Sequence, residues 1–235
     1  MSKEVITRGN LPHWYKPSAT HFVTFRLAGT LPQSVLNDLC DRKEQQLKVK
    51  RHGQSKAIHR ELVHKQLFAA YDEYLDRNRD IHCLDDPRIA ALVRRSLYHW
   101  NGRKYGLCAY CILPNHVHLL LRPFDRESPS QLDLEELEPG ERPDKWSPLA
   151  SVMHSLKSYT ANEANKILGR TGQFWQHESY DHWVRDDEEL ERIVAYINAN
   201  PIKAGLVQRP HDFLWCSAHD RYLHDGDESG WLVHD

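Results

Sequence analysis

Residues 108–123 read Cys-Ala-Tyr-Cys-Ile-Leu-Pro-Asn-His-Val-His-Leu-Leu-Leu-Arg-Pro, and the rest of the chain is best understood around this stretch. The run of leucines after the histidines predicts a central strand buried on both faces. Because side chains two apart in a strand share a face, His116 and His118 would project together. Two imidazoles side by side can hold one divalent metal ion. The chain has 16 histidines, so such a pair can arise by chance, but Val or Ile would fill a buried face at lower cost.

The segments around this strand alternate between strand and helix patterns. Strands are predicted at 20–27 and 105–113, and Pro114-Asn115 would join the second of these to the histidine strand as an antiparallel neighbour. Helices are predicted at 33–51 and 55–79, which together form a hairpin that turns at Gly53, and at 87–99 and 148–168. A last helix follows a capping pair, Asp186 and Glu189, and is expected to end before Asn200-Pro201.

Two segments fall outside these patterns. Residues 124–145 are acidic, contain several prolines and show little periodicity, so they are expected to form a long surface loop. Residues 209–235 are expected to be a C-terminal extension with exposed aromatic residues, including Trp215 and Trp231. The remaining chain, 1–208, is predicted to be a single domain with the helical hairpin, about 33–80, as an insertion.

Composition narrows the class of protein. A chain of 235 residues that is 40% hydrophobic can bury a proper core. It has no apolar run long enough to span a bilayer, and its first residues lack the apolar segment of a signal peptide. Five cysteines, an odd number at scattered positions, fit a reducing compartment. We therefore expect a soluble cytoplasmic protein with no membrane partner.

Charge gives a mixed indication about nucleic acid. The formal net charge of −2 argues weakly against a nucleic-acid partner, since such proteins are usually basic. However, eight Lys or Arg residues gather between Arg42 and Lys65, and such an element could follow a phosphate backbone. The same run could equally be the solvated face of a helix.

Cys108 and Cys111, followed by the two histidines, invite a zinc interpretation. A zinc knuckle needs its cysteine pair on a turn, whereas these two lie three apart in a predicted strand, on opposite faces. We therefore do not expect a zinc site here.

A paired-histidine metal site together with a tyrosine suggests phosphoryl transfer. A divalent ion withdraws charge from a phosphoryl oxygen, and a Tyr hydroxyl becomes a usable nucleophile when nearby cations favour its phenolate. Attack on DNA would give a covalent phosphotyrosine and release one strand end as a hydroxyl. Spacing alone does not identify which of the ten tyrosines would act.

Several further stretches, in order along the chain, carry a resemblance to a known family. They lie at 11–14, 22–26, 113–120, 154–160, 174–176, 179–182 and 196–207, the last reading Tyr-Ile-Asn-Ala-Asn-Pro-Ile-Lys-Ala-Gly-Leu-Val. With these motifs the chain resembles the REP-associated tyrosine transposases, which are single-tyrosine enzymes with a His-hydrophobic-His metal motif.

The resemblance implies a set of site residues. His116 and His118 would be the metal pair and Tyr180 the nucleophile. The third metal ligand would be His182, with Gln176, four residues before Tyr180, as the second choice. Lys157 matches a family lysine that would contact DNA phosphate, and Asn115 and Arg122, which flank the histidine pair, are further candidates for DNA contact.

The resemblance also implies a fold and an activity. The fold would be an α+β sandwich of ferredoxin or RRM type, with an antiparallel sheet and the helical hairpin as an insertion. The activity would be cleavage and rejoining of single-stranded DNA near palindromic hairpins, with Mg²⁺ or Mn²⁺ as cofactor. Relatives occur as dimers and as monomers, and a DNA-bound form would be associated with the nucleoid.

Two other functions remain open. A non-catalytic regulator of the same fold would bind hairpin DNA or RNA and would survive the loss of Tyr180. A metal-dependent phosphodiesterase would use an activated water molecule, would form no covalent adduct with DNA, and would also not need Tyr180.

Overall fold

The computed structural model describes residues 5–8, 12–49, 56–78, 80–124 and 147–220. Its centre is a four-stranded antiparallel sheet with the order β4-β5-β3-β6. The four strands are β3 (His21–Arg26), β4 (Tyr105–Ile112), β5 (His116–Pro123) and β6 (Tyr180–Trp183). A separate antiparallel pair is formed by β1 (Val5–Arg8) and β2 (Pro12–Tyr15). The predicted α+β class with an antiparallel sheet is confirmed.

The strand that carries the histidine pair is central, as predicted. β5 pairs with β4 on one side and with β3 on the other, and all of its residues except Arg122 are buried. Leu119 and Leu121 point to one face of the sheet, while His116, His118 and Leu120 point to the opposite face. The run of leucines is therefore accounted for by packing on both faces.

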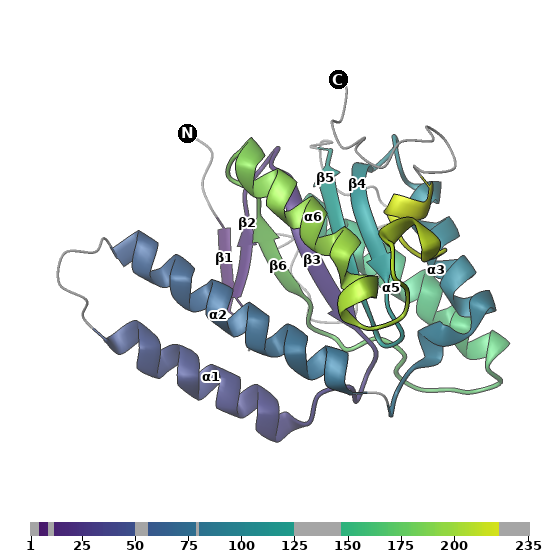
Figure 1. The fold of residues 1–235 in the computed structure, drawn as a ribbon, viewed down its shortest axis with the longest axis horizontal. Helices are drawn as coiled ribbons and strands as arrows, with labels where there is room; N and C mark the ends of the chain where they lie inside the picture. Colours follow the sequence, from purple (N-terminus) through teal and green to yellow (C-terminus); the bar gives the residue numbers. More distant parts are fainter. Residues whose placement is uncertain (1–4, 9–11, 50–55, 79, 125–146, 221–235) are drawn as a thin grey trace.

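Helices cover both faces of the sheet (Figure 1). On the first face, α3 (Pro87–His99) and α5 (Pro148–Ile167) pack against the cluster that contains Val23, Val117 and Leu119. On the second face, α6 (Asp187–Lys203) and α2 (Lys56–Arg77) pack against a cluster that contains Phe22, Leu120 and Tyr180. The histidine pair faces this second layer.

The predicted helical hairpin is confirmed within the described residues. α1 (Gln33–Lys48) and α2 follow β3 directly and extend beyond the edge of the sheet in Figure 1. A short 3-10 helix, η1 (Cys83–Asp85), then leads into α3. The residues of the turn itself, including Gly53, lie outside the described residues, as does almost all of the predicted acidic loop at 124–145.

The N-caps expected from the sequence are present. The side chains of Asp86, Ser147 and Asp186 each accept a hydrogen bond from a backbone N–H of the first turn of the helix that follows. Such caps satisfy N–H groups that have no partner within the helix.

The end predicted for the last helix is wrong. α6 continues through Pro201 to Lys203, although proline removes one backbone donor. The last turn is retained because Asn200 and Pro201 are buried, and because Lys203 forms ion pairs with two carboxylates of α2.

Two further expectations differ from the structure. One concerns the faces on which the two cysteines of β4 lie, and the other concerns the exposure of the segment that follows α6. A β-bulge between Leu107 and Ala109 turns Cys108 toward the same cluster as Cys111, so the two cysteines do not lie on opposite faces. After α6, η3 (Pro210–Asp212) packs against α6, and the residues that follow pack against β4, where Cys216 pairs with Cys111.

This C-terminal contact is extensive. Asp220 is buried and accepts hydrogen bonds from Tyr98, Tyr110 and Arg94. Trp215, expected to be exposed, is partly buried against the core, whereas Trp231 lies outside the described residues. The packed unit therefore extends to at least residue 220, beyond the boundary predicted at 208. Among the described residues, no helix is both long and apolar enough to cross a membrane.

Candidate metal centre

His116 and His118 are brought together on one face of β5, as the sequence predicts. Both side chains are fully buried, and their Nε2 atoms lie 3.2 Å apart. Their rings meet nearly at right angles, 79°, with centroids 4.7 Å apart. The two nitrogens therefore point toward a common position.

The other ring nitrogens are held by neighbouring side chains. His116 Nδ1 lies 2.6 Å from Asn115 Oδ1, and His118 Nδ1 lies 2.8 Å from Thr24 Oγ1. Asn115 Nδ2 donates to the carbonyls of Leu75 and Asn78, so its Oδ1 must be the acceptor for His116. His116 Nδ1 then carries the proton, and in the neutral ring Nε2 is left with a free lone pair.

A carboxylate completes the group. Asp72, from α2, places Oδ1 3.3 Å from His118 Nε2 and 3.9 Å from His116 Nε2. Among the described residues, Asp72, His116 and His118 are the one group of at least three His, Cys, Asp or Glu side chains that could hold a metal ion. Asp72 is 1% exposed, and its Oδ1 has no hydrogen bond of good geometry.

The electrostatics of the group favour a bound cation. Burial, helped by the neighbouring His118, lowers the pKa of His116 well below its usual value, so this ring is neutral. Burial alone would raise the pKa of Asp72, but hydrogen bonding and charge from His118, together with His116 and Lys203, bring it below its usual value. Lys203 pairs with Oδ2 of Asp72, which leaves Oδ1 facing the two imidazole Nε2 atoms. Two imidazole nitrogens and a carboxylate oxygen fit a divalent metal ion.

α6 places the Tyr196 side chain against this group and carries a second buried polar residue, Asn200. The Tyr196 ring lies 5.3 Å from the His118 ring, centroid to centroid. Its hydroxyl is buried without a well-aligned hydrogen bond, and burial together with the adjacent Asp72 carboxylate raises the pKa of Tyr196 above its usual value. Asn200, one turn further on, is 1% exposed; its Nδ2 donates to the Tyr196 carbonyl, and its Oδ1 has no hydrogen-bond partner.

Tyr180 lies on the same face of the sheet but further away. It pairs with Thr24, and Thr24 pairs with His118 on the other side, so β6 lies two strands from β5. This corresponds to about 10 Å between the backbones, twice the usual strand spacing. The Tyr180 ring contacts Phe68 and Phe22, whose rings also contact His118. Burial raises the pKa of Tyr180, as do the nearby Asp181 and Glu189.

The structure does not bring His182 or Gln176 to the histidine pair. His182 Nε2 lies 3.1 Å from Glu189 Oε1, at the N-terminal end of α6. Gln176 precedes β6, where its backbone N–H donates to the Arg26 carbonyl. His182 lies on β6, which pairs with β3 and is therefore two strands away from the strand that carries the histidine pair.

The three residues expected to contact DNA lie in different environments. Asn115 is buried and orients His116, as described above. Lys157 Nζ donates to the carbonyls of Gln176 and His177, at 2.6 and 2.7 Å, and burial with the nearby Arg26 charge lowers its pKa to about 8. Arg122 is exposed near the end of β5.

The sequence analysis missed Asp72, Tyr196 and Asn200 as site residues. Nothing in the local pattern of a helical acid such as Asp72 separates it from its neighbours Glu73 and Asp76. Tyr196 and Asn200 did carry a signal, because both belong to the stretch at 196–207 that contributed to the family resemblance.

Comparison with known proteins supports that resemblance. No family model matches the chain. A Haemophilus influenzae protein assigned as a REP-associated tyrosine transposase is 27% identical over 127 residues, which cover 53% of this chain and 66% of that protein. The match thus spans slightly less than two thirds of the curated relative. A solved structure of a REP-associated tyrosine transposase bound to a REP hairpin aligns with 95% of this chain and 90% of its own, with 17% identity and a TM-score of 0.49. The sequence match to the Haemophilus influenzae protein confirms the resemblance expected from the sequence motifs: the chain is similar to a REP-associated tyrosine transposase.

Proposed function

We propose that the protein is a metal-dependent transposase that cleaves and rejoins single-stranded DNA at palindromic hairpins through a 5′-phosphotyrosine intermediate. The observation that carries this proposal is the buried group of His116, His118 and Asp72, with a tyrosine ring packed directly against it. Sequence similarity to a REP-associated tyrosine transposase supports the choice of DNA as substrate. The order of strands and helices, with α3 and α5 on one face, is compatible with a ferredoxin or RRM type of sandwich.

The donor set indicates how the cofactor would be held. His116 Nε2, His118 Nε2 and Asp72 Oδ1 would be ligands, and the unpartnered Oδ1 of Asn200 is a candidate for a fourth. A divalent ion at this position would withdraw charge from a phosphoryl oxygen. The nitrogen ligands favour Mn²⁺ over Mg²⁺, which prefers an all-oxygen shell.

Two tyrosines are candidates for the nucleophile, and the geometry favours Tyr196 over Tyr180. The phenolic oxygen would attack the scissile phosphorus, a tyrosine–phosphate bond would form, and the 3′ oxygen of the preceding nucleotide would leave as a hydroxyl. The nucleophile must therefore reach a phosphate held at the histidine pair. Tyr196 already lies against His118, whereas Tyr180 is separated from the pair by β3 and by two phenylalanine rings.

The proposed activity also implies a cellular location, a partner and an oligomeric state. Five free cysteines agree with a reducing compartment, so we propose a cytoplasmic location, with the DNA-bound form at the nucleoid. The partner would be single-stranded DNA that folds into hairpins. The protein would act as a monomer or a homodimer.

The test uses labelled single-stranded oligonucleotides that carry the palindromes flanking the gene. They are incubated with the protein and Mn²⁺ or Mg²⁺ and separated on a denaturing gel. A retarded covalent band that is lost in His116→Ala supports the proposal. Binding without an adduct or a cut would instead indicate the regulatory DNA-binding function, and metal-dependent cutting without an adduct would indicate a phosphodiesterase.

A further inference from the structure

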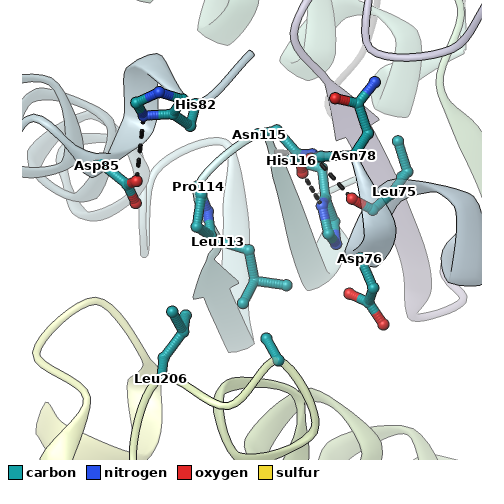
Figure 2. Close-up of a pocket in the computed structure, with 11 residues that line it drawn as sticks. Leu75, Asp76, Asn78, His82, Asp85, Leu113, Pro114, Asn115, His116 and Leu206 are labelled. Atoms are coloured by element: carbon teal, nitrogen blue, oxygen red, sulfur yellow. Dashed lines mark hydrogen bonds and ion pairs between the residues drawn. The ribbon is translucent and has the colours of Figure 1, made fainter. Parts of the chain in front are cut away.

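A cavity of about 270 Å³ opens beside the metal group, at the end of the sheet (Figure 2). Its walls come from the end of α2, from η1, from the turn between β4 and β5, and from the residues that follow α6. His116 lines this cavity as well as belonging to the metal group. The two sites are therefore direct neighbours.

Most of the cavity wall is either apolar or already paired. Leu75, Leu113, Pro114 and Leu206 supply apolar surface. Asn115 uses its amide on two carbonyls and on His116, as described above. At the rim, His82 Nδ1 pairs with Asp85 at 3.3 Å, as Figure 2 shows.

Asp76 is the exception. Both of its carboxylate oxygens are buried and lack a hydrogen bond of good geometry, although Lys203 Nζ lies 2.8 Å from Oδ2. A buried acceptor without a hydrogen bond is costly, and a ligand that offers N–H donors would remove this cost. The cavity thus combines apolar walls with one strong acceptor.

Lys203 connects the cavity to the metal group. Its Nζ lies 2.7 Å from Asp72 Oδ2 and 2.8 Å from Asp76 Oδ2, and its side chain is 49% exposed. A phosphate at the metal group would therefore lie next to this cation. Because His116 belongs to both sites, the nucleoside attached to that phosphate would lie next to the cavity.

We propose that the cavity binds one unpaired nucleobase of the DNA strand, adjacent to the phosphate held at the metal group, and that Asp76 accepts hydrogen bonds from the Watson–Crick edge of this base. Guanine fits best, because its N1–H and N2–H₂ donors are adjacent and match the two oxygens of a carboxylate. Single-stranded bases are commonly recognised on this edge while their faces lie against apolar side chains. This inference rests on the proposed function, because it assumes a DNA strand at the metal group.

The first experiment measures DNA binding by fluorescence anisotropy with the full chain and Mn²⁺. In hairpin oligonucleotides with single-stranded flanks, each unpaired guanine is replaced in turn by inosine, which lacks the N2 amino group. We expect one position at which the replacement weakens binding about 10- to 150-fold, the range for the loss of one hydrogen bond to a charged group. Asp76→Asn should weaken binding to the parent oligonucleotide to a similar extent and should add little on the inosine-containing one.

Two further variants distinguish the loss of base binding in the cavity from effects of changed charge on DNA binding. Ala204→Leu fills the cavity without changing charge and should also remove the discrimination between guanine and inosine. Asp85→Asn changes a carboxylate at the rim and should keep the discrimination. Unfolding temperature and Mn²⁺ affinity are measured for each variant to exclude damage to the fold or the metal group.

If the losses in binding free energy caused by Asp76→Asn and by inosine were additive, the two groups would not contact each other and the proposal would be overturned. The proposal would also be overturned if no guanine could be found whose replacement by inosine weakens binding. Ligand-detected NMR with the four deoxynucleoside 5′-monophosphates tests the cavity without a hairpin: deoxyguanosine monophosphate should bind best, and Ala204→Leu should abolish the signal. The transposase proposal fails separately, when the denaturing gel shows no covalent adduct. If none of the four nucleotides binds, the base-binding cavity is refuted whatever the gel shows.

Discussion

The ring of Tyr196 lies 5.3 Å from the ring of His118, whereas Tyr180 reaches the histidine pair only through Phe22 and Phe68. From this relationship we expect Tyr196→Phe to abolish the covalent protein–DNA adduct while hairpin binding is retained, because only the phenolic oxygen is removed. Tyr180→Phe should retain adduct formation. Both variants are compared on the same denaturing gel, with binding measured separately by anisotropy. Loss of the adduct in Tyr180→Phe alone would restore Tyr180 as the nucleophile.

Asp72 is expected to be a metal ligand. Asp72→Asn should lower Mn²⁺ affinity, because the amide removes the charge that faces the two Nε2 atoms. For the wild type, Mn²⁺ at 100 times its Kd should add about 2.7 kcal/mol to the free energy of unfolding, which is a rise of roughly 5–10 °C in Tm. This rise should be much smaller in Asp72→Asn.

His182→Ala provides the comparison for Asp72. Because His182 pairs with Glu189 and not with the histidine pair, this variant should keep the wild-type shift in Tm on addition of Mn²⁺, from a lower starting Tm. A lost shift in His182→Ala would instead support the ligand role expected from the sequence.

Thr24 is expected to act on the metal through His118. Its hydroxyl lies 2.8 Å from His118 Nδ1 and fixes the orientation of that ring. Thr24→Val should therefore weaken Mn²⁺ binding by about 10- to 100-fold, the usual effect of removing such a partner. Thr24→Ser keeps the hydroxyl and should bind Mn²⁺ nearly as well as the wild type. Weakening in Thr24→Ser but not in Thr24→Val would instead indicate a packing effect of the methyl group.

The pair of Glu189 and His182 predicts a dependence of stability on pH. Burial alone would raise the pKa of Glu189, but hydrogen bonds from His182 and from the Arg185 backbone N–H lower it from 4.5 to about 2. A carboxyl with a lowered pKa in the folded state stabilises the protein above pH 4.5 and loses this contribution as pH falls toward 2. Glu189→Gln should remove on the order of 1–3 kcal/mol of this acid-sensitive stability. Urea unfolding at several pH values measures it.

Glu188→Gln is the matched control for this measurement. Glu188 is the preceding residue, its side chain is 83% exposed, and it pairs only at the surface with Arg192. Its removal should leave the pH dependence of unfolding close to that of the wild type. If Glu188→Gln reduced the pH dependence of the unfolding free energy as much as Glu189→Gln does, a special role for the pair of Glu189 and His182 would be contradicted.

The sequence predicted the parts of the fold that depend on local pattern. The leucine run marked β5, and the caps at Asp86, Ser147 and Asp186 marked the starts of three helices, because each feature acts within a few residues. β6 was not predicted. Its four residues, Tyr-Asp-His-Trp, have no clear alternation, and they form a strand because β3 offers them a free edge.

The candidate site also contains residues that the local sequence pattern predicts and residues that only the packing of distant elements brings together. His116 and His118 were predicted because a strand places residues two apart on one face. Asp72 could not be predicted, because the sheet and α2 meet only through packing over a long stretch of chain. Tyr180 stays a prediction from the family resemblance, whereas the side chains found beside the histidine pair come from α2 and α6, which cover the face of the sheet that the histidines share.

Arg122 and Lys157 should differ in their effects on DNA binding. Arg122 is exposed near the end of β5, so Arg122→Ala should weaken binding to all single-stranded sequences and reduce the slope of log K against log salt by about 0.7, the effect of one lost phosphate contact. Lys157 instead donates to two backbone carbonyls ahead of β6. Lys157→Met should lower the free energy of unfolding by about 1–3 kcal/mol and leave the salt slope unchanged. Anisotropy titrations at several salt concentrations, with unfolding curves for both variants, separate these effects. A reduced salt slope in Lys157→Met would show that this lysine also contacts phosphate, as the family resemblance implies.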